Sequence, residues 1–147
     1  METIYNIKTI KIGLKIGEPI SGKISSPTFI YELAKGIYKD LDADQEHFII
    51  FSLDSKNQVR GYKIITSGGQ NSASPDPKII FRNALLLGAC GIILTHNHPS
   101  GDAEPSEEDL GFTKKLEQAG KMIDIDILDH LILGNTKYYS FKENRLI

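Results

Sequence analysis

The segment THNHPSGDAEPSEEDL, residues 95–110, holds the side chains best suited to chemistry. His96 and His98 are two residues apart, so on an extended backbone both imidazoles leave the same face, about 6.6 Å apart at Cα. Two imidazoles at that separation can converge on one metal ion, each at about 2.0–2.1 Å. Asp109, in the first turn of an expected helix, would add a carboxylate ligand. Such a set leaves a fourth position open for water, as catalytic zinc sites do.

Each half of this pattern also has an ordinary structural explanation. Ser106 and Asp109 match the N-cap and the third helical residue of a capping box, an arrangement that needs no metal. His96 and His98 alone could form a hydrogen-bonded polar cluster at the end of a strand. The combined pattern, His-x-His, seven residues and Ser-x-x-Asp, arises by chance in roughly one in two thousand chains of this composition. The cap and the metal site are compatible if Asp109 leaves the cap and Ser106 keeps it.

A hydrolytic metal site also needs a group that accepts a proton from the activated water. Glu46 directly precedes the apolar segment 47–54, and a neighbouring strand could bring it to the histidines. Without the histidine motif, this glutamate would be interpreted as a solvated charge at a strand end. Glu104, Glu107 and Glu108 are closer in sequence, but they fall in a loop or an outward first helical turn, which favours acidic residues anyway. Glu46 is therefore one candidate for the general base, and the nearer glutamates stay open as alternatives.

The elements that must position these residues follow the order β-α-β-β-α-β-α-β-β. Hydrophobic spacing and turn residues predict strands over 5–16, 47–54, 60–65, 90–95, 125–133 and 138–141, and helices over 27–40, from Asp76 to Gly88, and from Ser106 to Gly120. Segment 90–95 is a continuous apolar run, typical of a strand buried on both faces, and Cys90 is expected to be a small core residue in it. This order favours an α/β domain with a mixed sheet and helices packed on it.

Length and composition limit the class of protein. The chain has 147 residues, 40% hydrophobic and 24% charged, which excludes disordered and coiled-coil classes. It can bury one core and not two, so 1–147 is expected to be a single domain, with residues 1–25 as an N-terminal strand or extension. The apolar stretch 84–94 is too short to span a membrane and the first residues lack secretory features, so a cytoplasmic protein without a membrane partner is expected.

Charge and cysteine content exclude further possibilities. Seventeen basic residues stand against nineteen acidic ones, so the chain lacks the positive excess typical of nucleic-acid-binding domains. The single cysteine excludes an internal disulfide and a cysteine-rich zinc site. It also disfavours zinc deaminase chemistry, which uses a Pro-Cys-x-x-Cys motif.

The motif residues together resemble the JAB/MPN metalloenzyme domain, and specifically its RadC-like branch. The resemblance covers about residues 20–147, with the core motif over 46–142, and it rests on Glu46, the HNHPSG segment 96–101, Ser106, Asp109 and the pair Asp129-His130. Asn97 stands where deubiquitinating relatives usually have serine or threonine, which favours the RadC-like branch. The resemblance implies a cytidine-deaminase-like, three-layer α/β/α fold with a mixed sheet flanked by helices.

The same resemblance implies a mechanism. Zinc would be the cofactor, with His96, His98 and Asp109 as ligands, Glu46 as general base, and Ser106 stabilising the oxyanion. The implied function is hydrolysis of amide bonds, peptide or isopeptide, in a peptide or protein substrate. Two alternatives are a nucleic-acid-binding module associated with DNA repair, which the charge does not support, and a non-catalytic protein-interaction domain, which retention of all five motif residues disfavours.

Asp129 and His130 form the remaining polar pair in an apolar strand. Asp129 could accept a hydrogen bond from the second nitrogen of a ligand imidazole, as metal sites usually require. A packed and mutually satisfied pair is the preferred interpretation, so neither residue is included among the predicted site residues.

Overall fold

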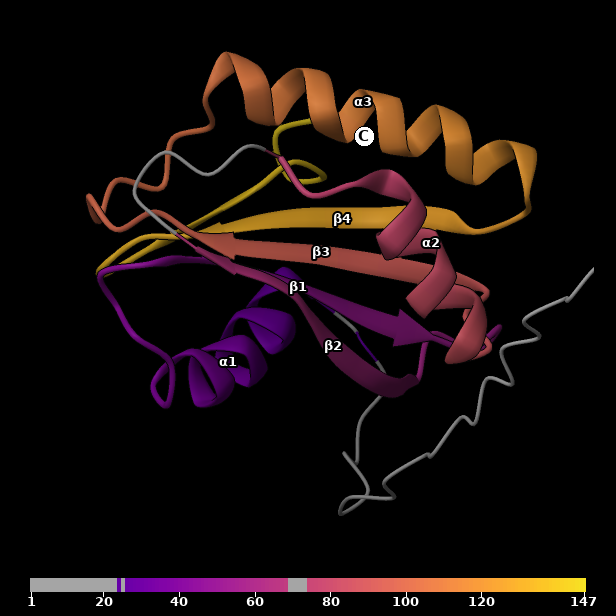
Figure 1. The fold of residues 1–147 in the computed structure, drawn as a ribbon, viewed down its shortest axis with the longest axis horizontal. Helices are drawn as coiled ribbons and strands as arrows, with labels where there is room; N and C mark the ends of the chain where they lie inside the picture. The colour runs from indigo at the N-terminus through magenta and orange to yellow at the C-terminus, as the bar shows by residue number, and fades with distance from the viewer. Residues whose placement is uncertain (1–23, 25, 69–73) are drawn as a thin grey trace, which may run out of the picture.

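A computed structural model describes residues 24, 26–68 and 74–147 of the chain. Within these ranges, a five-stranded mixed sheet has the order β2-β1-β3-β4-β5 (Figure 1). The elements along the chain are α1 (Pro27–Tyr38), β1 (Glu46–Leu53), β2 (Val59–Gly68), α2 (Pro77–Leu86), β3 (Gly91–Asn97), α3 (Glu107–Met122), β4 (Asp126–Leu133) and β5 (Tyr138–Ser140). Each predicted helix and strand from α1 onward is therefore present.

Strand pairing brings distant segments of the sequence together at one end of the central strands. Strand β1 pairs antiparallel with both β2 and β3, so the start of β1 lies beside the end of β3, where Phe48 pairs with His96. Strands β3 and β4 are parallel, and α3 supplies the crossover that a parallel pair requires. The first turn of α3 consequently lies near the end of β3.

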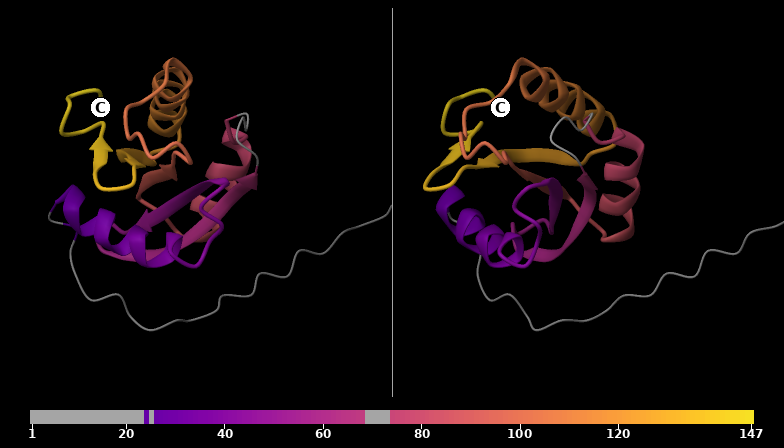
Figure 2. Two further views of the ribbon diagram at one scale, coloured as in Figure 1. Left: turned by 90° about the vertical axis from the view of Figure 1, so that its left-hand side faces the viewer. Right: turned by 60° about the vertical axis from the view of Figure 1, so that its left-hand side comes forward.

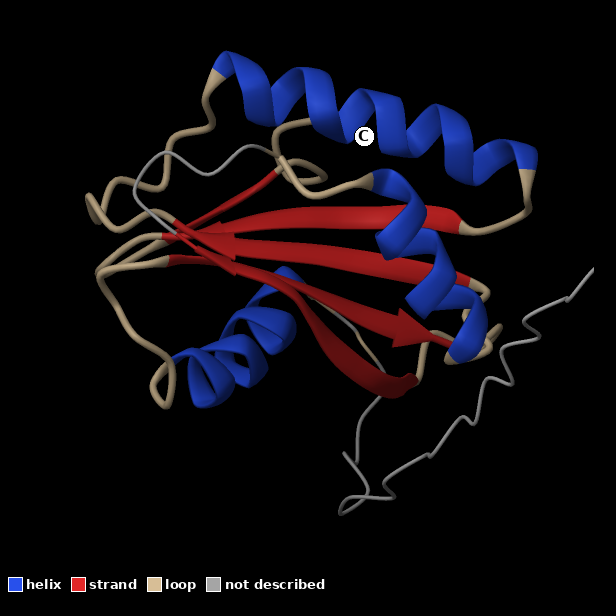
Figure 3. Ribbon diagram, in the orientation of Figure 1, coloured by secondary structure: helices blue, strands red, loops and turns tan. Residues whose placement is uncertain are grey.

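Alternating side chains of the strands enter two separate hydrophobic cores. Phe48, Ile50, Ile92 and Leu94 pack beneath α2 and α3, whereas Ile49, Phe51, Leu53, Ile93, Leu131 and Leu133 pack against α1. Figures 2 and 3 show α1 on one face of the sheet and the other two helices on the opposite face. The predicted three-layer α/β/α fold is confirmed.

Gly120 was expected to end α3, and this prediction is wrong. The helix continues to Met122, and Gly120 is buried inside it. A Cβ atom at this position would clash with the carbonyl oxygen of Ile125, whose own N–H donates to the Gly120 carbonyl at 3.0 Å. Gly120 thus permits close approach of the chain entering β4, and a glycine in sequence does not distinguish this role from a helix stop.

The prediction that Cys90 belongs to the core is also wrong. Strand β3 begins one residue later, at Gly91, and the Cys90 side chain is exposed. The backbone of Cys90 still joins the sheet, because its N–H donates to Leu53 and its carbonyl accepts from Asp126. An apolar sequence run therefore placed the strand one residue too early.

Two further expectations concern the N-terminal strand and the absence of a membrane-spanning helix. The strand predicted over 5–16 and most of the N-terminal extension lie outside the described residues. In the ranges that are described, no helix combines the length and the hydropathy needed to cross a bilayer.

Candidate metal centre

The candidate site lies where the end of β3, the first turn of α3 and the start of β1 meet. His96 is buried in the last part of β3, and His98 follows directly after the strand. The chain then reverses at Gly101, which has a φ of 82° and whose N–H donates to the His98 carbonyl at 2.9 Å. This reversal allows α3 to begin near the strand end that it has just left.

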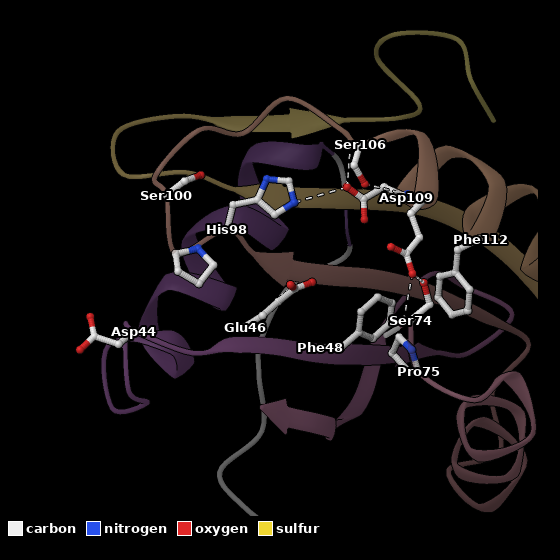
Figure 4. Close-up of a pocket in the computed structure, with 12 residues that line it drawn as sticks. Asp44, Glu46, Phe48, Ser74, Pro75, His98, Ser100, Ser106, Asp109 and Phe112 are labelled. Atoms are coloured by element: carbon white, nitrogen blue, oxygen red, sulfur yellow. Dashed lines mark hydrogen bonds and ion pairs between the residues drawn. The ribbon is translucent and has the colours of Figure 1, made fainter. Parts of the chain in front are cut away.

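The structure brings the three predicted ligands together. The Nε2 atoms of His96 and His98 are 3.0 Å apart, and each lies 3.3 Å from an oxygen of the Asp109 carboxylate. One ligand atom from each residue falls within 4.8 Å of the others, close enough for the three to hold one metal ion. In Figure 4, His98 and Asp109 point toward each other across the site.

Asp109 stays in the helix cap while it faces the two imidazoles. The Ser106 hydroxyl accepts the Asp109 N–H at 3.1 Å, and Asp109 Oδ2 accepts the Ser106 N–H at 2.8 Å, which completes a capping box. A carboxylate has about four acceptor positions, so one group can close the cap and also face the imidazoles. The cap therefore fixes the orientation of the candidate ligand.

A chain of buried hydrogen bonds sets the protonation of His96. The Asp109 carbonyl can only accept, so the Thr113 hydroxyl, 2.7 Å away, must donate its proton there. Thr113 must then accept from Nδ1 of His130 at 2.6 Å. Burial holds the pKa of His130 well below its usual value and keeps the ring neutral. Its Nε2 is therefore unprotonated, and it accepts from Nδ1 of His96 at 2.8 Å.

The same reasoning applies to His98. Its Nδ1 lies 2.8 Å from the carbonyl oxygen of Asp102 and must donate to it. In their neutral forms, His96 and His98 therefore direct Nε2 lone pairs toward each other beside a carboxylate. Such an arrangement requires a cation between them, either a proton or a metal ion. Two imidazole nitrogens and a carboxylate oxygen are donors suited to a divalent metal.

Without a metal, the cluster shares protons internally. The hydrogen bond to Asp109 raises the pKa of His98, and partial burial opposes this effect. Burial alone would raise the pKa of Asp109, but the hydrogen bonds from His96 and His98 outweigh it and hold that pKa well below its usual range. The carboxylate is thus ionised and available as a ligand at neutral pH.

Glu46 approaches the cluster from the β1 side. Its Oε1 is 3.9 Å from Nε2 of His96, and its side chain is 25% exposed. It borders a cavity of about 590 Å³ that also has His98, Ser106 and Asp109 on its wall (Figure 4). Four of the five predicted site residues therefore line one cleft, and the fifth, His96, is buried beside them with its Nε2 3.0 Å from that of His98.

Two of the three alternative glutamates have other partners. Glu108 lines the same cavity, but its carboxylate accepts from the Ser74 hydroxyl at 3.0 Å. Glu104 is exposed and lies 3.8 Å from the Lys137 ammonium. Glu46 consequently remains the candidate base.

The roles of His130 and Thr113 were not predicted from the sequence. Asp129, considered there as a partner of a ligand imidazole, instead accepts from the Ser140 hydroxyl and from the backbone N–H groups of His130 and Lys142. The neighbouring residue His130 contacts His96, because successive side chains of β4 face opposite sides of the sheet. Thr113 lies four residues after Asp109 and thus on the same helix face. This spacing is the signal that could have indicated the chain of hydrogen bonds from Asp109 to His96.

Comparison with known proteins agrees with this geometry. The family model for the RadC-like JAB domain matches residues 24–146. A UPF0758 protein of Methanosarcina mazei is 40% identical over 126 residues, 85% of this chain and 54% of the relative. UPF0758 proteins of Carboxydothermus hydrogenoformans and Clostridium perfringens are 42% and 41% identical, over 82% and 90% of this chain and 53% and 58% of their own. The chain spans about half the length of these curated relatives, and it belongs to the RadC-like JAB domain family.

Proposed function

We propose that this chain is a zinc-dependent hydrolase of amide bonds. The observation that carries the proposal is the convergence of two imidazole lone pairs and the Asp109 carboxylate beside an open cleft. A second carboxylate, that of Glu46, lies 3.9 Å from Nε2 of His96. Nε2 of His96, Nε2 of His98 and the Asp109 carboxylate would hold the ion. When bound by such a set, zinc lowers the pKa of water and polarises a carbonyl oxygen.

Glu46 would act as the general base and then as the general acid. Its carboxylate accepts a proton from the attacking water and returns it to the nitrogen of the leaving amine. Partial burial at the strand end directs the carboxylate into the cleft. The side chain can therefore serve both transfers from one position.

Ser106 would donate a hydrogen bond to the carbonyl oxygen as negative charge develops on it. The hydroxyl oxygen accepts the Asp109 N–H, and among the described residues the hydroxyl proton has no acceptor. A donor held in place by a helix cap needs little reorganisation during the reaction. Capping and oxyanion stabilisation are thus compatible in one residue.

The cleft supports a peptide or protein substrate rather than a nucleic acid. Four carboxylates line it, from Asp44, Glu46, Glu108 and Asp109, and no lysine or arginine is among its described lining residues. Phosphate groups would be repelled by such a surface. The adjoining aromatic wall, where the rings of Phe48 and Phe112 meet edge to face, suits uncharged parts of a polypeptide.

The test is a Glu46→Gln variant assayed on a broad panel of peptides and isopeptides. Glutamine keeps the volume of the side chain but cannot accept the proton, so we expect full zinc content and at least an about 10²-fold slower hydrolysis. Glu108→Gln is the matched control in the same cleft and should keep its activity. A Glu46→Gln variant with unchanged turnover would refute the assignment, and loss of zinc would make Glu46 a ligand. A zinc-loaded wild type that cleaves no substrate of the panel would contradict the hydrolase proposal.

A further inference from the structure

Asn97, the residue between the two candidate ligands, has no role in the proposed chemistry but makes an unusual contact. The backbone pairing of β1 with β3 ends at Phe48 and His96. One residue further, the Asn97 side chain continues it: Oδ1 accepts the His47 N–H at 2.7 Å, and Nδ2 donates to the Gln45 carbonyl at 2.9 Å. These two backbone groups flank Glu46.

A carboxamide is the side chain that fits this position. The carbonyl of one residue and the N–H of the residue two further along point the same way from an extended strand, so their partner must accept and donate at once. A carboxamide presents both an acceptor oxygen and an NH₂ group, as a peptide unit does, whereas an aspartate lacks the donor and a serine has one oxygen for both tasks. The amide of Asn97 thus takes the place of a peptide unit in the ladder.

The backbone of Asn97 is itself fixed, because it pairs with Leu133 on the parallel strand β4. A second contact comes from α1, where the Tyr38 hydroxyl donates to the His47 carbonyl at 3.0 Å. The start of β1 is therefore fixed by contacts from both α1 and β3, and the contact from β3 comes from the residue between the two candidate ligands.

We propose that Asn97 is a positioning residue, which fixes the Glu46 carboxylate relative to the imidazoles of His96 and His98. This inference rests on the proposed role of Glu46 as general base. Asn97 lies in the same short segment as both ligands, so one segment would set the positions of the ligands and of the base. A displacement of about 1 Å at a reacting group can slow a reaction roughly 10²-fold, so loss of this contact should affect turnover more than substrate binding.

The first experiment measures amide hydrogen exchange by NMR in wild type, Asn97→Ala and Asn97→Asp. The matched control is Asn83→Ala, because the Asn83 side chain also donates to a backbone carbonyl, that of Ile79, but lies in α2. In Asn97→Ala the His47 amide should exchange at least about tenfold faster, with zinc content unchanged. Asn97→Asp keeps the acceptor but sets a carboxylate oxygen against the Gln45 carbonyl, so it should restore the protection only in part. An unchanged His47 exchange rate in Asn97→Ala would overturn the inference.

The second experiment is a double-mutant cycle on hydrolysis. Asn97→Ala should lower kcat about 10- to 100-fold with little change in KM, and should add nothing to the loss caused by Glu46→Gln, because it acts through Glu46. Additive losses would show that Asn97 acts elsewhere and would overturn the inference. A wild type without activity on the panel would defeat the hydrolase proposal and with it the positioning role, while the exchange data would still decide whether Asn97 holds the strand.

Discussion

Replacing Thr113 with valine tests the hydrogen-bond chain that sets the protonation of the candidate ligand His96. The change removes the hydroxyl and keeps the side-chain shape, so Nδ1–H of His130 loses its acceptor. His130 and Thr113 are 0% and 2% exposed, so water cannot easily replace the hydroxyl. A buried donor left without a partner costs about 1–3 kcal/mol, and the metal-free protein should lose stability on that scale.

The same substitution should weaken zinc binding. Without the Thr113 acceptor, His130 can move its proton to Nε2, and His96 must then accept at Nδ1 and carry its own proton on Nε2, where the metal would bind. Loss of an outer partner of a metal ligand typically lowers metal affinity about 10- to 100-fold, which corresponds to roughly 1.4–2.8 kcal/mol.

Thr95→Val is the matched control for this prediction. Thr95 is also buried and lies in β3 next to His96, but its hydroxyl contacts the Tyr38 hydroxyl at 3.1 Å and the Ile49 carbonyl at 3.4 Å on the opposite face of the sheet. Urea unfolding of the metal-free proteins should show losses in both variants. A chelator competition titration should show weaker zinc binding in Thr113→Val alone. Equal zinc affinities in the two variants would refute the protonation argument.

Two further predictions concern the cap and the effect of pH. Ser106→Ala should lower stability by about 0.5–2 kcal/mol through loss of the cap and slow hydrolysis roughly 10²-fold, about 3 kcal/mol of activation energy; undiminished activity with a lower Tm would leave Ser106 as a cap alone. The raised pKa of His98 means that its proton must leave before zinc binds, so zinc affinity should rise with pH and level off above that pKa. In the metal-free protein, the same shift stabilises the fold fully below about pH 6.5, and this contribution is lost as pH rises through the folded-state pKa. Isothermal titrations between about pH 5 and 8 would contradict the assignment if zinc affinity did not change.

Local features of the sequence were sufficient to predict much of the fold and the ligand set. Apolar periodicity and the Ser106 cap predicted the helices and strands, because each element carries its own burial pattern. The proximity of the candidate ligands His96, His98 and Asp109 was predictable because they lie within one strand–loop–helix unit, whose geometry is largely local.

Features that depend on the pairing of distant segments were harder to predict from the sequence. The approach of Glu46 to His96 depends on the register of β1 against β3, and no local pattern fixes it. The contact of His130 with His96 depends in the same way on the pairing of β3 with β4. Gly120 was misinterpreted because a glycine that permits close approach of the Ile125 backbone looks the same in sequence as a glycine that ends a helix.

The most direct test of the account is the zinc content of the purified chain, measured by native mass spectrometry and elemental analysis. We expect about one zinc ion per chain in the wild type. The ion should be lost in His98→Ala, which removes a ligand at the edge of the cleft, and kept in the remote control Asn83→Ala. A wild type that takes up no zinc on titration, or a His98→Ala variant that retains it fully, would contradict the proposal that His96, His98 and Asp109 form a metal centre.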